Sequence, residues 1–249
     1  MRAHLFLRAV PLLAVLRLAT VQAACMPWGP PPGSPGDDNG CLTLDAAKSK
    51  CEQTIAGNVS SKLVGPILKC HMKLAADLFR RGMASTFDEE ACESAAMQKF
   101  ADKSDNSGCP CVNEPIVELM ASVTLDDNNY LVSCDPDGPA INTFPNGGDD
   151  TGRVPSTPAV LACETAMGKA IAKLVKSRIK CHQKYAADYV KTNGYPVVDE
   201  ETCEDAADAV FATAVARLPG CQGCEDVPGV FAQMNLTLDG ANSLVFCEE

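Results

Sequence analysis

The residues best suited to chemistry in this chain lie in a short stretch that occurs twice. The segment KCHMKLAAD begins at Lys69, and KCHQKYAAD begins at Lys180, 111 residues later. The two copies supply His71 and His182, the only histidines besides His4. Neutral imidazole is a common metal ligand, so this equivalence would allow a metal site shared between the two copies. Such a site would also need carboxylates, because the adjacent cysteines are expected to be used in disulfides.

A structural role explains the same residues without a ligand. Each histidine follows its cysteine by one position, which places it about 100° further around a helix. If the cysteines lie on the packed seam, the histidines face the flank of the helix. We therefore expect His71 and His182 to be structural or solvated, and we keep them as candidate metal ligands.

Closely spaced cysteines raise the question of redox chemistry. Cys109-Pro110-Cys111 and Cys221-Gln222-Gly223-Cys224 precede expected helix starts, and a helix N-terminus can lower a thiol pKa. However, acidic Glu225 and Asp226 would oppose that effect, and no βαβ pattern surrounds either motif. We expect these cysteines to bridge different partners as structural disulfides.

Acidic clusters suggest calcium only weakly. The segment Asp135–Gly138 resembles the start of an oxygen-ligand loop, but the bidentate glutamate expected further along is missing. The triplets at 88–90 and 199–201, both Asp-Glu-Glu, fit the first turn of a helix, where negative charge is favourable. We interpret them as helix N-terminal charges.

Catalytic motifs do not emerge from the sequence. It lacks a Gly-x-Ser-x-Gly turn, a phosphate-binding glycine loop and a metalloprotease histidine pair. We therefore expect no enzyme activity, no catalytic residues and no cofactor.

The cellular location follows from the first residues and the cysteines. Residues 1–23 have the form of a secretory signal peptide, with early arginines, an apolar run and small residues before a cut after Ala23. All 14 cysteines lie beyond that cut, which favours a disulfide framework in a secreted or periplasmic protein. No later apolar run is long enough to span a membrane.

The charge balance limits the partners. Without residues 1–23, 18 basic side chains face 32 acidic ones, which disfavours a nucleic-acid partner. An unidentified protein or a small apolar ligand remains the expected partner.

Matching cysteines define the organisation of the chain. After residues 1–23 we expect a Pro/Gly-rich N-terminal segment at 24–42, a first cysteine-rich helical repeat at 43–134, a flexible linker at 135–156, and a second repeat at 157–249. The fold class is all-α, with two tandem disulfide-stapled helical hairpins of about three helices each.

Helix signals support this plan in the second repeat. Thr157-Pro158 is a good helix start, and apolar residues then recur at steps of four and three until about Thr192. Asp199 can cap the next helix. Short third helices are expected after Asn113 and Asp226.

The cysteine spacings predict the disulfides. The interval from Cys163 to Cys181 equals that from Cys203 to Cys221, so an antiparallel hairpin would align an inner and an outer pair. In the first repeat the corresponding interval is one residue longer and contains Gly65-Pro66, where a bulge or kink could absorb the extra residue. The expected pairs are Cys25–Cys41, Cys51–Cys109, Cys70–Cys92, Cys111–Cys134, Cys163–Cys221, Cys181–Cys203 and Cys224–Cys247.

Three functions follow from these observations. The first is a non-enzymatic exported protein that acts as an extracellular interaction or structural module. The second is a carrier that encloses a small apolar ligand or lipid between the hairpins and the third helices. The third is a metal-binding protein that uses His71, His182 and nearby carboxylates. Asn58 and Asn235 match the N-glycosylation pattern.

Overall fold

The structure of the protein is a computed structural model that describes residues 26–27, 39–104, 109–148, 150–218 and 226–247. It is mostly helical, as expected. The expected signal peptide and most of the Pro/Gly-rich segment lie outside the described residues. A two-stranded antiparallel sheet pairs β1 (Met26–Pro27) with β2 (Cys41–Leu42). None of the helices within the described ranges is both long and apolar enough to cross a membrane.

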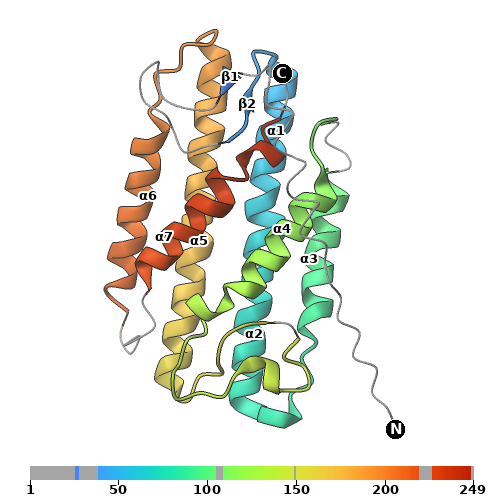
Figure 1. Cartoon of the computed structure of the whole chain (residues 1–249), viewed down its shortest axis with the longest axis vertical. Helices are drawn as coiled ribbons and strands as arrows, with labels where there is room; N and C mark the ends of the chain where they lie inside the picture. The colour runs from blue at the N-terminus through green and yellow to red at the C-terminus, as the bar shows by residue number, and fades with distance from the viewer. Residues whose placement is uncertain (1–25, 28–38, 105–108, 149, 219–225, 248–249) are drawn as a thin grey trace.

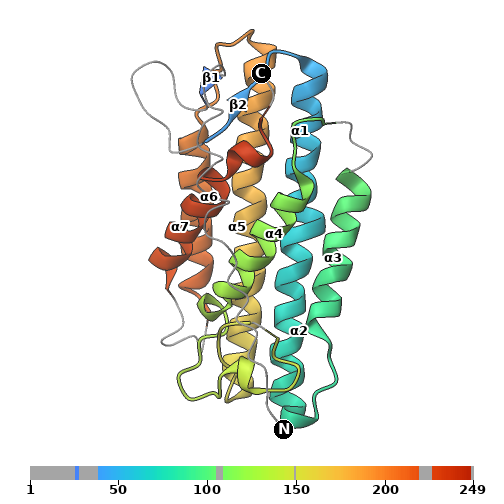
Figure 2. The same cartoon turned by 45° about the vertical axis from the view of Figure 1, so that its right-hand side comes forward.

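Two long helical columns form the centre of the molecule (Figure 1). One column joins α1 (Ala46–Asn58), a π-helix (Val59–Val64) and α2 (Gly65–Arg81), and the other is the single helix α5 (Pro158–Lys191). Helix α3 (Glu89–Ser104) lies beside α2, and α6 (Glu200–Val215) lies beside α5. Helices α4 (Glu114–Asp127) and α7 (Val227–Met234) cross the columns obliquely, as Figures 1 and 2 both show.

Short single turns complete the chain. They are 3₁₀ turns at Gly82–Ala84, Asn129–Leu131, Ile141–Thr143 and Asn242–Leu244, and a π turn at Asn235–Asp239.

Side-chain caps fix the helix starts where the sequence predicts them. The hydroxyl of Thr157 accepts a hydrogen bond from the backbone N–H of Val160, and the carboxylate of Asp199 accepts one from Thr202. Each cap satisfies a backbone N–H that has no partner inside the helix. Helix α5 ends at Lys191, and Asn193 and Gly194 follow with positive φ, a common helix ending.

The π-helix accounts for the unequal cysteine spacing. Its wider turns accommodate an additional residue between Cys51 and Cys70, directly before Gly65-Pro66. Helix α5 spans the shorter interval from Cys163 to Cys181 as a regular α-helix. The bulge that the sequence predicts is therefore present.

One apolar core runs between the columns and the oblique helices. Its completely buried side chains include Ile55, Leu63, Ile67, Phe100 and Phe246. A smaller cluster lies at the end of α2, where Leu74 and Leu78 pack against Ile141 and Val154.

This smaller cluster corrects the expectation of a flexible linker at 135–156. Ile141 is 0 % exposed, and an isolated bridge pairs Ala140 with Arg153. The guanidinium of Arg153 also donates to the carbonyl of Gly138 at 2.8 Å. The Pro-, Gly- and Asp-rich composition thus encodes tight turns in a packed segment rather than a spacer.

Among the described residues, three of the expected disulfides are seen. Cys51 is bonded to Cys109, Cys70 to Cys92, and Cys181 to Cys203. Cys25 and Cys221 lie outside the described residues, so the expected pairs Cys25–Cys41 and Cys163–Cys221 stay predictions. The inner bonds tie α2 to α3 and α5 to α6.

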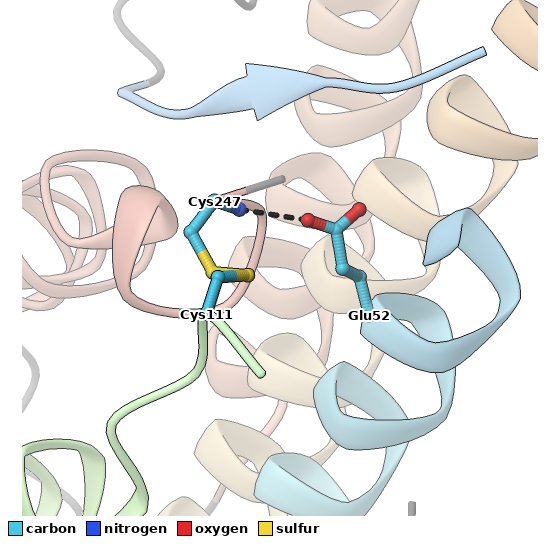
Figure 3. Close-up of side chains that lie close together, drawn as sticks. All are labelled: Glu52, Cys111 and Cys247. Atoms are coloured by element: carbon cyan, nitrogen blue, oxygen red, sulfur yellow. Dashed lines mark hydrogen bonds between the residues drawn. A yellow bond between two sulfur atoms is a disulfide. The ribbon is translucent and has the colours of Figure 1, made fainter. Parts of the chain in front are cut away.

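The expected pairs Cys111–Cys134 and Cys224–Cys247 are wrong, because Cys111 is bonded to Cys247 (Figure 3). This bond links the start of α4 to the end of the chain. The segment after α7 packs on α1, where the carboxylate of Glu52 accepts a hydrogen bond from the N–H of Cys247 at 2.8 Å. Spacing within one sequence copy could not reveal a bond between the copies.

The segment after α4 makes the corresponding contact with α5. The N–H of Cys134 donates to the carboxylate of Glu164 at 3.2 Å. Glu52 and Glu164 both directly follow the first cysteine of their sequence copy. In each sequence copy, therefore, a glutamate near the start accepts a hydrogen bond from the last cysteine of the other copy. These two contacts hold the two columns together.

Peptide mapping without reduction should link Cys111 to Cys247. The protein should be digested under mildly acidic, thiol-blocked conditions to prevent exchange, and the Cys70–Cys92 bond provides an internal control. A peptide linking Cys111 to Cys134 would contradict the crossed arrangement.

Glu164 should make stability depend on pH. Burial raises the pKa of Glu164 from 4.5 to about 8, although backbone N–H groups of Asp135 and Cys134 act in the opposite direction. The folded protein then binds this proton more tightly than the unfolded chain, so the stabilisation is complete below pH 4.5 and is lost as the pH rises through 8. At about 1.4 kcal/mol per pKa unit, the change from 4.5 to about 8 makes this loss about 5 kcal/mol.

Urea unfolding of wild type and Glu164→Gln across this pH range would measure the effect. As the pH rises, the unfolding free energy of wild type should fall relative to that of Glu164→Gln, because the variant has no carboxyl group to ionise at this position. A constant difference from pH 4.5 to pH 8 would contradict the raised pKa.

Candidate metal centre

His71 lies in the middle of α2 with its side chain turned into the protein. Only 2 % of its surface is exposed. The preceding residue, Cys70, is bonded to Cys92 of α3, and Glu93 follows Cys92 directly. The disulfide and the His71–Glu93 contact are therefore neighbouring links between the same two helices. The Nε2 of His71 lies 2.6 Å from Oε1 of Glu93.

Glu89 reaches the same imidazole from the first turn of α3. It lies four residues before Glu93 and so shares a helix face with it. Its Oε1 is 3.5 Å from Nε2 of His71, and its side chain is only 3 % exposed.

Asp126 enters from the last turn of α4. Its Oδ1 lies 3.2 Å from Nε2 of His71, while its Oδ2 accepts a hydrogen bond from the hydroxyl of Ser122 at 3.0 Å. The hydroxyl leaves one carboxylate oxygen facing the imidazole. Such outer contacts are typical of groups that orient metal ligands.

Asp150 completes the group from the packed segment at 135–156. Its Oδ1 lies 3.4 Å from Nε2 of His71, and only 1 % of its surface is exposed. The next residue, Thr151, donates its backbone N–H and its hydroxyl to the carbonyl of Asp126, which ties this segment to the end of α4. Gly152 has φ +113°, and a Cβ there would lie 2.7 Å from the carbonyl oxygen of Ser133. A glycine is thus required beside Asp150.

We call His71, Glu89, Glu93, Asp126 and Asp150 the His71 cluster. Four buried carboxylates converge on one nitrogen, which can donate only one hydrogen. Burial by itself lowers the pKa of His71, but the hydrogen bonds with Asp126 and Glu93 and the charge of Asp150 outweigh it and raise that pKa to about 10. Burial, followed by the contact with Glu93 and the charge of Asp150, raises the pKa of Glu89 well above its usual range. The cluster therefore attracts positive charge strongly.

The second histidine has its own group, which we call the His182 cluster: His182, Glu200, Glu204 and Asp239. The Nε2 of His182 lies 2.8 Å from Glu204, 3.1 Å from Glu200 and 3.6 Å from Asp239. All four residues are less than 10 % exposed. In the matching sequence copies, these residues correspond one by one to His71, Glu89, Glu93 and Asp126.

An arginine distinguishes the second cluster from the first. Arg178 is 4 % exposed, and its Nη1 lies 3.0 Å from Glu204 and 2.8 Å from Asp239. Its Nε and Nη2 form a bidentate pair with Asp208. These carboxylates hold the pKa of Arg178 above its ordinary value despite burial. The residue that corresponds to Arg178 near His71 is Ile67, which is completely buried and carries no charge.

The structure changes the interpretation of the candidate ligands. A metal site shared by His71 and His182 is wrong, because each histidine faces the carboxylates of its own neighbouring helices. Neither histidine is solvated. Glu89 and Glu200 do lie in the first turn of a helix, but they are buried ligand candidates rather than surface charges.

Several other sequence candidates have structural roles. The carboxylate of Asp135 accepts a hydrogen bond from the N–H of Asp137 within a local turn, and another from the N–H of Ser156, which joins the two ends of the segment. Cys109 and Cys111 bridge two different partners, as expected.

The sequence alone did not identify Glu93, Asp126 and Asp150 as candidate ligands. Glu93 and Asp126 carried a signal, because both recur in the second copy as Glu204 and Asp239. Asp150 has no counterpart there, so only the fold could find it.

No known protein family matches the chain, and no curated protein or solved structure is similar to it. The buried clusters are therefore the features from which a function is inferred.

Arg178 should be essential to the stability of its half of the protein. Arg178→Ile installs the residue found at the corresponding position near His71 and leaves Glu204, Asp208 and Asp239 without their cation. Removing one partner of a buried ion pair costs about 3–5 kcal/mol. Denaturant unfolding should show a loss of this size, whereas Arg217→Gln, at an exposed position of the same half, should change the unfolding free energy little. Equal midpoints for Arg178→Ile and wild type would contradict this role.

Proposed function

We propose that this chain is an exported metal-binding protein that holds one divalent cation in the His71 cluster. The observation that carries the proposal is the difference between the two clusters. Near His182, a guanidinium lies among the carboxylates, whereas near His71 an isoleucine takes that position and a further carboxylate, Asp150, is added. A metal ion would supply the positive charge that Arg178 supplies to the other cluster.

The distances within the cluster suit a bound cation. Four carboxylate oxygens lie 2.6–3.5 Å from Nε2 of His71. In a six-coordinate site with bonds of about 2.1 Å, neighbouring donor atoms are about 3.0 Å apart. In a tetrahedral zinc site the corresponding spacing is about 3.4 Å. A cation could therefore replace the imidazole proton with small movements of the side chains.

The donor atoms indicate which cations fit. Carboxylates suit Mg²⁺, Ca²⁺ and Mn²⁺, whereas imidazole suits Zn²⁺, Fe²⁺ and similar ions. One imidazole with up to four carboxylates favours Mn²⁺, Fe²⁺ or Zn²⁺. Copper(I) is disfavoured, because Cys70 and Cys92 are bonded to each other and cannot act as thiolate ligands.

The arrangement favours retention of the ion over catalysis. Catalytic zinc sites keep a coordination position for water or substrate, but this cluster offers five protein ligands that are all buried. Three ligands lie on helices that the Cys70–Cys92 bond joins.

Export is the location that the chemistry of the protein supports. Structural disulfides persist in oxidising compartments, and four are seen within the described ranges. The amino-terminal sequence has the form of a secretory leader. Metal retention outside the cytoplasm would also account for the acidic composition, because carboxylates attract cations.

Metal content should distinguish the two clusters. Wild-type protein produced with its disulfides intact should carry one equivalent of Mn²⁺, Fe²⁺ or Zn²⁺ by elemental mass spectrometry, and should rebind one equivalent after chelation in a calorimetric titration. Glu93→Gln should weaken that binding by about 100-fold or more, because it removes a direct ligand and one negative charge.

Glu204→Gln is the matched control, since Glu204 occupies the corresponding position beside His182. It should leave the stoichiometry and the affinity unchanged. Folding of each variant is verified by circular dichroism and by the Cys70–Cys92 peptide. Absence of metal uptake by folded wild-type protein, or equal losses in both variants, would overturn the proposal.

A further inference from the structure

An apolar cavity that opens to the surface on one side lies where the two columns meet the oblique helices. Its volume is about 120 Å³. The walls come from α1 and the π-helix, α5, α4, and α7 with the turn that follows it; they include Val59, Val117, Ile171, Val175 and Met234. Met120 of α4, which also lines the cavity, is 40 % exposed, so this wall reaches the surface. The cavity is separate from the carboxylates of the His71 cluster.

Two asparagines in this apolar wall have side chains without the partners that buried amides normally have. Asn129 is 2 % exposed and Asn242 is 4 % exposed. Both amide atoms of Asn129, and the Nδ2 of Asn242, lack a hydrogen-bond partner in the described part of the chain. Buried polar groups are almost always paired, so such atoms call for a partner of another kind.

The two asparagines occupy equivalent places. Each follows an aspartate of a histidine cluster by three residues, Asn129 after Asp126 and Asn242 after Asp239. Each accepts two backbone hydrogen bonds at its carbonyl, from residues 132 and 133 or from residues 245 and 246. The backbone of each turn is thus satisfied while the amide is left beside the cavity.

We infer that the cavity binds a small apolar molecule that carries a hydrogen-bond-accepting group, such as a ketone, ester or alcohol. The amide N–H groups of Asn129 and Asn242 would donate to that group, and the aliphatic walls would enclose the rest. An apolar cavity of about 150 Å³ takes benzene, so this cavity of about 120 Å³, with one wall at the surface, would hold a ligand of about six or seven non-hydrogen atoms. A long acyl chain would not fit.

This inference is independent of the metal site. It rests on the volume and on the two unpaired amides, and the proposed cation binds elsewhere. It also sharpens the carrier hypothesis, because it names the size of the ligand and the polar group that it needs.

A pair of probes separates the amide contribution from simple cavity filling. Cyclohexanone and methylcyclohexane have the same number of non-hydrogen atoms and similar shape, but only the ketone accepts hydrogen bonds. Titration of methyl-labelled protein by NMR should show both probes shifting methyl signals of Val117, Ile171 and Val175. In Asn129→Leu the ketone should bind at least tenfold more weakly, whereas methylcyclohexane should bind as well as before or better.

Further variants locate the binding and control for unfolding. Val175→Phe should abolish binding of both probes by filling the cavity, whereas Val210→Phe, on the exposed face of α6, should not. Asn242→Leu repeats the test at the second amide if Asn129→Leu folds poorly, and Asn142→Leu is the exposed control.

Three results would overturn the inference. They are the absence of binding by either probe to folded wild type up to its solubility, an unchanged preference for the ketone in both Asn129→Leu and Asn242→Leu, and unchanged binding in folded Val175→Phe. The first would mean that the cavity does not admit a ligand, the second that the amides do not recognise it, and the third that the probes bind elsewhere.

Discussion

The structure depends on burying groups of like charge between its helices. Carboxylates are rarely buried without a cation, because removing them from water costs several kcal/mol each. This protein buries groups of carboxylates at two corresponding places, around His71 and around His182. Beside His182 the cost is offset by Arg178, whose guanidinium contacts Glu204, Asp208 and Asp239. Around His71 the positive charge must come from protons or, as we propose, from a metal ion.

Disulfides hold these charges together. The Cys70–Cys92 bond lies one residue from both His71 and Glu93, and the Cys181–Cys203 bond has the same relation to His182 and Glu204. Each bond fixes the spacing between two helices at the level where like charges would otherwise push them apart. This explains why cysteine and histidine are adjacent in both copies. A disulfide alone would not need a neighbouring histidine, and a buried histidine alone would not need a neighbouring cysteine.

Much of the fold could be predicted from the sequence. Thr157-Pro158 and Asp199 located the starts of α5 and α6, and equal cysteine spacings identified the inner disulfides. The Cys111–Cys247 bond could not be found in this way, because it joins the two copies, whereas the spacing argument considered each copy alone. Bonds between copies follow from packing of the columns, which no local pattern encodes.

Only part of the candidate site was predictable from the sequence, because its burial also depends on how the helices pack. The recurrence of Glu93 as Glu204 and of Asp126 as Asp239 was visible in the sequence, but caps and surface charges explained acidic residues equally well. Burial decides between these explanations, and burial depends on the tertiary structure. Nothing in the sequence marked Asp150 as a buried residue, because the Pro-, Gly- and Asp-rich composition around it is typical of exposed turns.

The candidate metal centre and the cavity share the end of α4. Asp126 faces His71, and Asn129 lines the cavity one turn later, within the 3₁₀ turn that follows the helix. Thr151 binds the carbonyl of Asp126, so the segment that carries Asp150 is attached to the same point. The proposed cation would therefore bind next to the turn that forms this wall, without contacting the ligand in the cavity. Near His182, Arg178 contacts Asp239, and Asn242, three residues after Asp239, also lines the cavity. One wall of the cavity thus adjoins a cluster that already contains a guanidinium, and the other adjoins the cluster in which we propose that a metal ion supplies the positive charge.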